Sequence, residues 1–393
     1  MLTTSRWKTD PRQFWLREGS PPEPVRFDAE AGTWHVCGYR EAQAVLDDTA
    51  TYSSNTGRLM PEAEEYVGSS LTQLDPPRHT QLRQLVSQAF TPRVVAGMEP
   101  RIRAFATKLL DDAPSDRLDL VGEFAQPLAV AVIAELLGVP SADRARIHGW
   151  VDGMFSGSSD VIVRERTPDQ ERELLEEMYH AQEMAAYFGD QVAQRRRSPR
   201  DDLLTRLVQA EVDSTRLTDM EVVSLANLLL IAGHMSTTML VGNTCLCLGI
   251  NTVDRAMVET NRSLIPAAIE ESLRLLTPFA MLTRVTARET ELAGRTIGAD
   301  ELVMIWIGAA NRDPRQFPRP HDFELDRDPN PHLAFCRGVH SCLGAPLARL
   351  EGWIAINLLI DRYPHLRCDP ADPPVFLRSP RLTGLRRLML LLR

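Results

Sequence analysis

The sequence lacks an excess of positive charge and is almost without lysine. Its 393 residues carry 44 basic and 53 acidic side chains, which gives a net charge of −9 at pH 7. This balance excludes a general nucleic-acid-binding protein, because such a protein needs a basic face for phosphates. Lysine occurs only at positions 8 and 108, so arginine provides nearly all of the positive charge. We interpret this bias as the codon usage of a GC-rich genome.

The sequence also lacks a hydrophobic run long enough to span a membrane. The longest apolar run without glycine extends from Leu128 to Ala134, and the longest run with glycine from Leu302 to Ala310. A spanning helix needs about 20 apolar residues. Residues 1–17 contain scattered charges and no apolar core, so no secretory signal is visible. We therefore expect a soluble, cytoplasmic protein that binds no membrane.

Cysteine is scarce, with six residues in the chain. This number is too small for a disulfide framework in a protein of this length. Cys245 and Cys247 lie within an apolar helical pattern, where buried free thiols are expected. The chain is 44% hydrophobic, so it can bury a sufficient core without disulfides or a structural metal.

The pattern of apolar residues is mainly helical. Proline-rich patches punctuate the chain without dividing it, and no internal repeat is visible. Apolar residues at helical spacing predict helices over 98–112, 127–138, 168–197, 218–249, about 264–276 and about 345–360. Short β-like segments follow around 281–287, 290–297 and 302–307. We therefore expect a mainly α protein with small β-sheets, an α+β class, in a single domain over 1–393. Its helix-rich core would cover about 75–280 and 345–360, and its small sheets about 20–40, 281–310 and 365–393.

The longest predicted helix opens with a capping box. Thr218 stands at its N-cap and Glu221 at the third helical position, and the run reaches about Ile250. The centre of this helix, Leu228–Gly233, is apolar on all sides, so we expect it to be buried.

The most informative segment surrounds Cys342. This cysteine lies just before the helix predicted from about Ala345, and Pro346 suits the first turn of that helix. A thiol there is close to the positive helix end and to free N–H groups, so we expect its pKa to fall. Gly338 and Gly344 would let the loop turn tightly and bring amides near the sulfur. The segment is therefore a candidate site for a held thiolate.

Three interpretations of this loop compete. A buried structural cysteine is the simplest. A phosphatase loop requires His directly before Cys, whereas Ser341 stands there, and the spacing to Arg349 is one residue too long. A zinc site formed by Cys336, His340 and Cys342 would lack a second ligand pair with zinc spacing.

The loop resembles the haem-binding segment of the cytochrome P-450 superfamily, Phe-x-x-Gly-x-His-x-Cys-x-Gly. The matching residues, followed by Leu347-Ala348-Arg349, are Phe335, Gly338, His340, Cys342 and Gly344. The chain departs from the bacterial form at Cys336, where glycine is usual. The resemblance implies a triangular-prism, mostly helical fold with small sheets. It also implies haem b (iron protoporphyrin IX) with the Cys342 thiolate as axial ligand of the iron.

Other blocks of the chain extend the resemblance. Glu271 and Arg274 match the Glu-x-x-Arg pair of the family, upstream of residues 309–317, which resemble the next block. In the family this pair is locked by a later arginine, for which Arg327 is the candidate. The resemblance gives these three residues a structural role beneath the haem.

Four basic residues match the positions that contact the haem propionates in the family. His79 and Arg83 share one helix face; Arg284 and His340 are the other two. Propionates are carboxylates, which favour cationic or N–H donors. The remaining cofactor contacts implied by the resemblance are Gly344, Phe335, Ala232 and Gly233.

The long helix aligns with the family's Ala-Gly-x-Asp/Glu-Thr-Thr segment, which forms a kinked groove for dioxygen and relays protons. The acid position is Met235 and the alcohol position Ser236, and a one-residue shift would give the alcohol role to Thr237. Methionine cannot carry a proton, so the catalytic candidates are Ser236 and Thr237. In either register this segment has no carboxylate.

The resemblance implies an oxidoreductase, a haem-thiolate monooxygenase that hydroxylates or epoxidises a hydrophobic small molecule in bacterial natural-product biosynthesis. Polyketides, macrolides or carrier-bound amino acids are the expected substrates, and fatty acids or terpenes stay open. Electrons would come from a ferredoxin with its reductase, or from a flavodoxin, docking near Arg337, Arg101 or Arg103. We expect a monomer.

Two alternatives stay open: atypical chemistry, such as oxidative coupling, nitration or peroxide-driven oxidation, and a non-catalytic haem sensor. A sensor would need an output region, and none is visible. Family position places the substrate pocket at Met60, Met154, Leu228, Met235, Phe279, Met281, Leu282 and Phe376.

Overall fold

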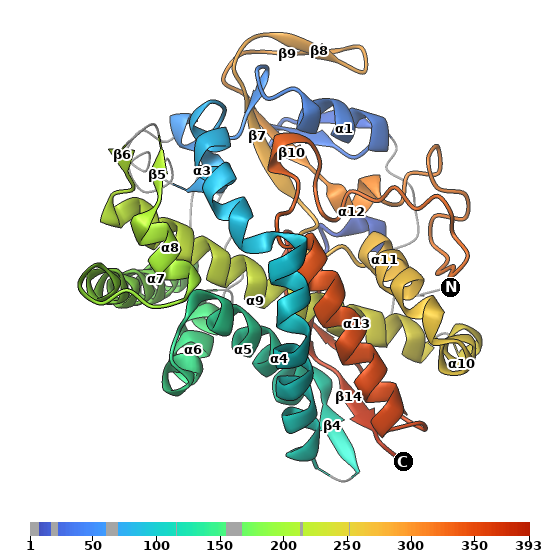
Figure 1. The fold of residues 1–393 in the computed structure, drawn as a ribbon. Coiled ribbons are helices and arrows are strands. Elements are labelled where there is room, and N and C mark those ends of the chain that lie inside the picture. The colour runs from blue at the N-terminus through green and yellow to red at the C-terminus, as the bar shows by residue number, and fades with distance from the viewer. Residues whose placement is uncertain are drawn as a thin grey trace.

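The computed structural model describes residues 8–16, 23–59, 70–114, 116–154, 167–212, 215–250 and 252–393. Its helices are α1 Tyr39–Asp47, α3 Arg78–Ser87, α4 Pro92–Asp111, α5 Gln126–Leu137, α6 Arg144–Met154, α7 Pro168–Arg197, α8 Leu203–Gln209, α9 Asp219–Ile250, α10 Thr252–Thr260, α11 Ile265–Leu275, α12 Ile307–Ala310 and α13 Ala345–Arg362. Helices dominate and the strands are short, so the expected mainly α class with small sheets is confirmed (Figure 1).

The strands form one larger sheet and several small ones. They are β1 Val25–Asp28, β2 Thr33–Val36, β3 Tyr52–Ser53, β4 Arg117–Asp119, β5 Glu211–Val212, β6 Thr215–Arg216, β7 Leu282–Thr286, β8 Thr290–Leu292, β9 Arg295–Ile297, β10 Leu302–Ile305, β11 Arg367–Cys368, β12 Val375–Phe376, β13 Leu385–Arg387 and β14 Met389–Leu391. The five-stranded sheet has the order β1-β2-β10-β7-β3. Strand β10 pairs parallel to β2 and antiparallel to β7, so β7, which carries Arg284, is fixed inside the sheet.

The long helix α9 lies at the centre of the helical part. Helices α5 and α13 both pack against it, and α13 also packs against α4 and α11 (Figure 1). The contact with α5 is close at Gly233, where a Cβ atom would lie 2.9 Å from the side chain of Ile133. The capping box is present, because Thr218 Oγ1 accepts from Glu221 N at 3.2 Å and Glu221 accepts from Thr218 N at 2.9 Å.

Three expectations about these elements were wrong. The strand predicted over 290–297 is a hairpin, because Ala293 and Gly294 turn with positive φ values of 50° and 74°. The helix predicted from residue 98 begins at Pro92, since proline is tolerated in a first turn. The centre of α9 is not wholly buried: Ala232 is exposed. One side of this apolar stretch therefore faces open space.

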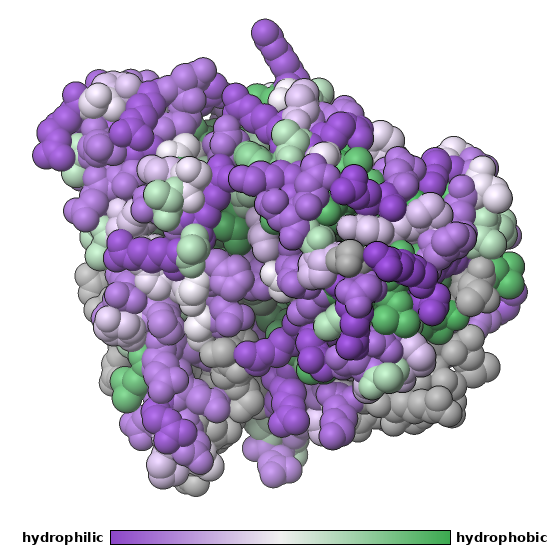
Figure 2. Space-filling view, turned by 90° about the horizontal axis from the view of Figure 1, so that it is seen from below, coloured by the Kyte–Doolittle hydropathy of each residue, from purple (hydrophilic) through white to green (hydrophobic). Residues whose placement is uncertain are grey.

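Two helical stretches are long and apolar enough to cross a membrane by composition, Leu120–Leu137 and α9. Of these stretches, 72% and 56% is buried inside the protein, as in core helices of soluble proteins. The face shown in Figure 2 is mainly hydrophilic, with hydrophobic residues scattered among polar ones.

Candidate active site

The Cys342 loop is held by its own backbone. Cys342 N donates to Phe335 O at 2.8 Å, and the amides of Gly344 and Ala345 donate to the Cys342 sulfur. These contacts bring N–H groups to the sulfur, as the sequence predicted. The ring of Phe335 lies under the Arg349 guanidinium, 4.5 Å from its carbon to the ring centre.

The expected fall in the pKa of Cys342 was wrong. Burial raises the pKa of the thiol, and this effect exceeds the opposing effects of the two amides and of Arg83. Cys342 is nevertheless accessible to solvent. The sulfur therefore lies in a recess of the protein, where a bound metal cation would supply the missing stabilisation of the thiolate.

Only one of the two glycines in this loop needs to be glycine for conformational reasons. Gly338 has φ +67°, and a Cβ atom there would lie 2.9 Å from Leu46 O. Gly344 has φ −80°, which any residue adopts. A Cβ atom at Gly344 would lie 4.0 Å from Cys342 Sγ, which is an ordinary van der Waals contact. Cys336 adopts a positive φ of 56°, which is costly for a residue with a side chain. This strain explains why glycine suits its position.

The four predicted propionate contacts lie in one group. The rings of His79 and His340 are 4.1 Å apart between centres, and His340 Nε2 lies 2.9 Å from Ser54 Oγ. Arg83 donates to the backbone oxygen of Ser341. Arg284 shares this environment, because its charge acts on both histidines.

This group has donors without acceptors. Both ring nitrogens of His79 and the Nε of Arg284 are buried and unpartnered. Burial first, then the charge of Arg284, lowers the pKa of His340 to about 3, and burial and Arg83 lower the pKa of His79. Both imidazoles are therefore neutral N–H donors beside two guanidinium groups. Such a donor set fits a ligand that brings carboxylates, as the propionates of haem do.

The candidate proton-relay residues lie on α9. Ser236 is half-buried and donates to Ala232 O at 2.5 Å, whereas Thr237 is buried. Both candidates stand beside Met235, which is 9% exposed. This segment of α9 carries no carboxylate. Of the two hydroxyls, only that of Ser236 lies on an accessible side of the helix.

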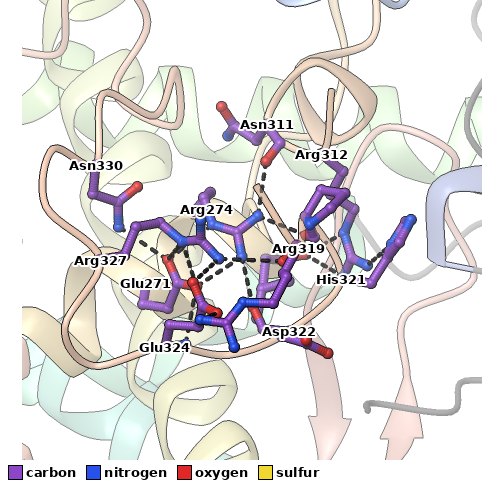
Figure 3. Close-up of polar contacts among 12 residues, drawn as sticks. Glu271, Arg274, Asn311, Arg312, Arg319, His321, Asp322, Glu324, Arg327 and Asn330 are labelled. Carbon is purple, nitrogen blue, oxygen red and sulfur yellow. Dashed lines mark hydrogen bonds and ion pairs between the residues drawn. The ribbon is translucent and has the colours of Figure 1, made fainter. Parts of the chain in front are cut away.

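The Glu-x-x-Arg pair is the centre of a buried ion network (Figure 3). Arg274 donates to Glu271 through Nε at 2.8 Å and Nη2 at 2.7 Å, and both side chains are fully buried. Arg327 Nε donates to Glu271 at 3.0 Å, so this arginine occupies the third position that the resemblance assigned to it. Asn330, which the sequence did not indicate, adds a hydrogen bond of 3.0 Å to Glu271.

The same network ties distant segments together through backbone oxygens. Arg274 also donates to the carbonyls of Asn311, Pro320 and Asp322 at 2.7–3.0 Å. In Figure 3 these groups surround the Arg274 guanidinium. The pair therefore fixes the loop that leads to the Cys342 segment.

The structure brings only some of the predicted pocket residues together. Met154, Leu228, Met235 and Phe279 belong to one apolar cluster, together with Leu382. Three others lie elsewhere. Met281 and Phe376 are packed in the core around α4, α11 and α13, and Leu282 packs beside the larger sheet. Met60 is outside the described residues.

Two polar residues that sequence reasoning missed are buried inside the protein. Glu351 on α13 is 3% exposed and its Oε2 has no partner. His234 on α9 has two unpartnered ring nitrogens facing His148. No local motif marks these residues, because their burial follows from packing between distant segments.

Comparison with known proteins decides the family. A family model described as Cytochrome P450 matches residues 257–389. The cyclomarin C epoxidase CymV of Salinispora arenicola (strain CNS-205) is 38% identical over 389 residues, covering 96% of this chain and 95% of the epoxidase. This chain is a cytochrome P450. A putative cytochrome P450 of Bacillus subtilis (strain 168), YjiB, is 37% identical over 91% of this chain and 89% of its own length.

Solved structures agree with the assignment of this chain to the cytochrome P450 family. The structure of HmtT, described as involved in himastatin biosynthesis, has a TM-score of 0.89 and 46% identity, covering 100% of both chains. A structure described as belonging to unusual cytochrome P450-like monooxygenases of microbial secondary metabolism has a TM-score of 0.93 and 43% identity, over 98% of this chain and 100% of that one. The protein is thus a monooxygenase of the family whose haem b is bound through a cysteine thiolate.

Proposed function

We propose that this P450 hydroxylates or epoxidises a hydrophobic product of bacterial secondary metabolism, with Cys342 as the axial ligand of its haem iron. The observation that carries the proposal is the arrangement of Cys342 and the donor group. An accessible cysteine with two amides on its sulfur lies on the same loop as His340, whose ring packs on that of His79. Both ring nitrogens of His79 and the Nε of Arg284 are buried without a partner. The two features match the two chemical ends of haem, its iron and its propionates.

In this proposal the protein binds and orients the cofactor through named residues. His79, Arg83, Arg284 and His340 hold the two propionates, and Phe335 and Ala232 border the ring. When bound, thiolate-ligated haem inserts one oxygen atom from O2 into a C–H bond or a double bond. The amides of Gly344 and Ala345 would stabilise the Cys342 thiolate by hydrogen bonding to its sulfur.

Proton supply to the reacting oxygen falls to Ser236. Its hydroxyl is accessible and donates to Ala232 O at 2.5 Å, which leaves the oxygen lone pairs free to accept from water. When the hydroxyl turns away from that carbonyl, it can donate its proton and take one from water. Thr237 is buried and stands behind it. The unshifted register, with Ser236 at the alcohol position, is therefore the one that we propose.

The substrate class rests on the relatives and on the apolar cluster. Among the relatives are an epoxidase named for cyclomarin C and a hydroxylase named for C-12 of erythromycin. The cluster of Met154, Leu228, Met235 and Phe279 offers apolar and adaptable side chains. A polyketide, macrolide or carrier-bound amino acid is the substrate type that we propose.

A ferredoxin with its reductase, or a flavodoxin, is the proposed electron donor to a cytoplasmic, monomeric enzyme. The candidate docking arginines are partly neutralised within the chain. Arg337 pairs with Asp47 at 2.7 Å, Arg101 with Glu135 at 2.9 Å, and Arg103 with Glu99 at 3.0 Å. Docking of an acidic partner would therefore compete with these intramolecular pairs.

The experiment is turnover of macrolides, cyclic peptides and polyketides with a surrogate ferredoxin system and NADPH under 18O2. We expect a product heavier by one 18O atom from at least one scaffold. Product formed only with peroxide, or a coupled or nitrated product, would replace this proposal with an atypical P450 reaction. Normal haem binding without any product would favour a sensor.

A further inference from the structure

A buried serine contacts the imidazole of His340. Ser54 directly follows β3 and is 1% exposed, and its hydroxyl oxygen lies 2.9 Å from His340 Nε2. The other ring nitrogen, Nδ1, makes no hydrogen bond with any residue that the structure describes. Because the two nitrogens point to different sides of the ring, the serine leaves Nδ1 free for another ligand.

The direction of this hydrogen bond follows from the surroundings of the serine. Within the described part of the chain, His340 Nε2 is the single acceptor for the Ser54 hydroxyl hydrogen. If the hydroxyl instead accepted from an Nε2–H group, its own hydrogen would be buried without an acceptor, which costs free energy. Ser54 therefore donates, and Nε2 accepts with its lone pair.

His340 carries a single ring proton. The ring of His79 lies 4.1 Å away between centres, and the positive charges of Arg284 and Arg83 act on the His340 ring. A second proton on this ring is therefore unfavourable. Since Nε2 accepts from the serine, the one ring proton lies on Nδ1. Ser54 thus selects the tautomer in which the free side of the ring is a donor.

The position of Ser54 is fixed from the start of α3, the helix that carries His79. Asp75 Oδ1 accepts from Ser54 N at 2.9 Å, and Oδ2 accepts from the hydroxyl of Ser53. The backbone oxygen of Asp75 accepts from His79 N at 3.0 Å. The serine hydroxyl and the two histidine rings therefore keep fixed positions relative to one another.

We propose that Ser54 is a positioning residue for the cofactor, which holds His340 in the tautomer and ring orientation in which Nδ1–H donates to a propionate carboxylate of haem. This inference rests on the proposed function and adds to it a residue that acts on the haem only through His340. A carboxylate can only accept hydrogen bonds. The opposite tautomer would face it with the bare lone pair of Nδ1, so the control of the proton by Ser54 matters for binding.

The test measures the release of haem from the loaded enzyme into an excess of apomyoglobin, followed by Soret absorption. His340→Phe should release haem about ten- to a hundredfold faster, because it removes a hydrogen bond to a charged group. Ser54→Ala should release haem about two- to tenfold faster, because the ring keeps its N–H but the proton is no longer directed to Nδ1. Ser70→Ala, which removes a solvent-exposed hydrogen bond to Thr72, is the matched control and should leave the rate unchanged.

Two further measurements separate this role from a purely structural one. In the His340→Phe background, Ser54→Ala should have no additional effect on release, because the serine acts through the imidazole. With haem whose propionates are methyl esters, Ser54→Ala should speed release less than with native haem, because the ester lacks the charged oxygens. A serine that only stabilised the local backbone would speed release equally in every case.

Three results would overturn the inference: an unchanged release rate in Ser54→Ala, an equal acceleration with and without the His340 ring, or an equal acceleration with native and esterified haem. Each would leave the proposed monooxygenase intact, because His340→Phe tests the propionate contact separately. Conversely, an enzyme that shows the expected release rates but oxidises no natural product would contradict the proposed function alone.

Discussion

Replacing Glu271 by glutamine should destabilise the protein severely, although the change is nearly isosteric. Glu271 accepts hydrogen bonds from Arg274, Arg327, Asn330 and the backbone of Glu324, all at 2.7–3.2 Å. The carboxylate is fully buried. In Glu271→Gln the Arg274 guanidinium loses its counter-charge, Arg327 keeps only its pair with Glu324 at 2.6 Å, and the amide NH2 faces donors.

Breaking a buried ion pair on one side costs about 3–5 kcal/mol. A typical folded domain is stable by about 5–15 kcal/mol, so this one change removes a large share of the total. For a chain of this size the loss corresponds to a fall in melting temperature of about 4–6 °C. Haem should also be lost more readily, because the network fixes the loop that leads to Cys342.

The assay is thermal unfolding of the haem-loaded protein, followed by circular dichroism and by Soret absorption. Glu99→Gln is the matched control, because Glu99 also binds an arginine, Arg103 at 3.0 Å, but both side chains are exposed at the surface. Surface pairs contribute at most about 1 kcal/mol, so the control should melt within about 1 °C of the unaltered protein. Equal losses in the two variants would refute the reasoning.

Three further predictions concern substitutions at single positions. Cys336→Gly should keep the spectrum of thiolate-bound haem and raise the melting temperature, because glycine relieves the positive φ of 56°; loss of that spectrum would contradict this. Ser236→Ala should lower product formed per NADPH consumed and release peroxide, more than Thr237→Ala does, since general acid–base groups contribute about 10²–10⁴-fold; the reverse order would favour the shifted register. Burial raises the pKa of Glu351 well above its usual value, so the folded state holds its proton and loses stability as pH rises above the normal carboxyl pKa. Glu351→Gln should therefore raise the melting temperature at pH 8 and change it little at pH 4. An equal change in melting temperature on substitution at the two pH values would contradict this.

Local patterns predicted the elements that depend on local interactions. The capping box at Thr218 begins α9, and the apolar spacing of 168–197 matches α7, because both signals act within a few helical turns. The hairpin at Ala293 and Gly294 was missed because an alanine in a left-handed turn has no sequence signal.

The chemistry of the site depended more on tertiary packing. The motif placed Cys342, His340 and Arg284 correctly in one region, but it gave the wrong direction for the pKa of Cys342, because burial outweighed the local amides. The burial of Glu351 could not be predicted, since it arises where α13 packs against α4, α9 and α11. Burial of a charge is a property of the assembled fold.

The central claim is that the Cys342 thiolate binds the haem iron. The most direct measurement is the absorption spectrum of the reduced protein under carbon monoxide, for the unaltered chain, Cys342→His and Cys342→Ser. The account predicts the strongly red-shifted Soret band of thiolate-bound haem in the unaltered protein, and loss of that band and of monooxygenation in Cys342→His, with haem still bound. Retention of both the band and turnover in Cys342→Ser would contradict it.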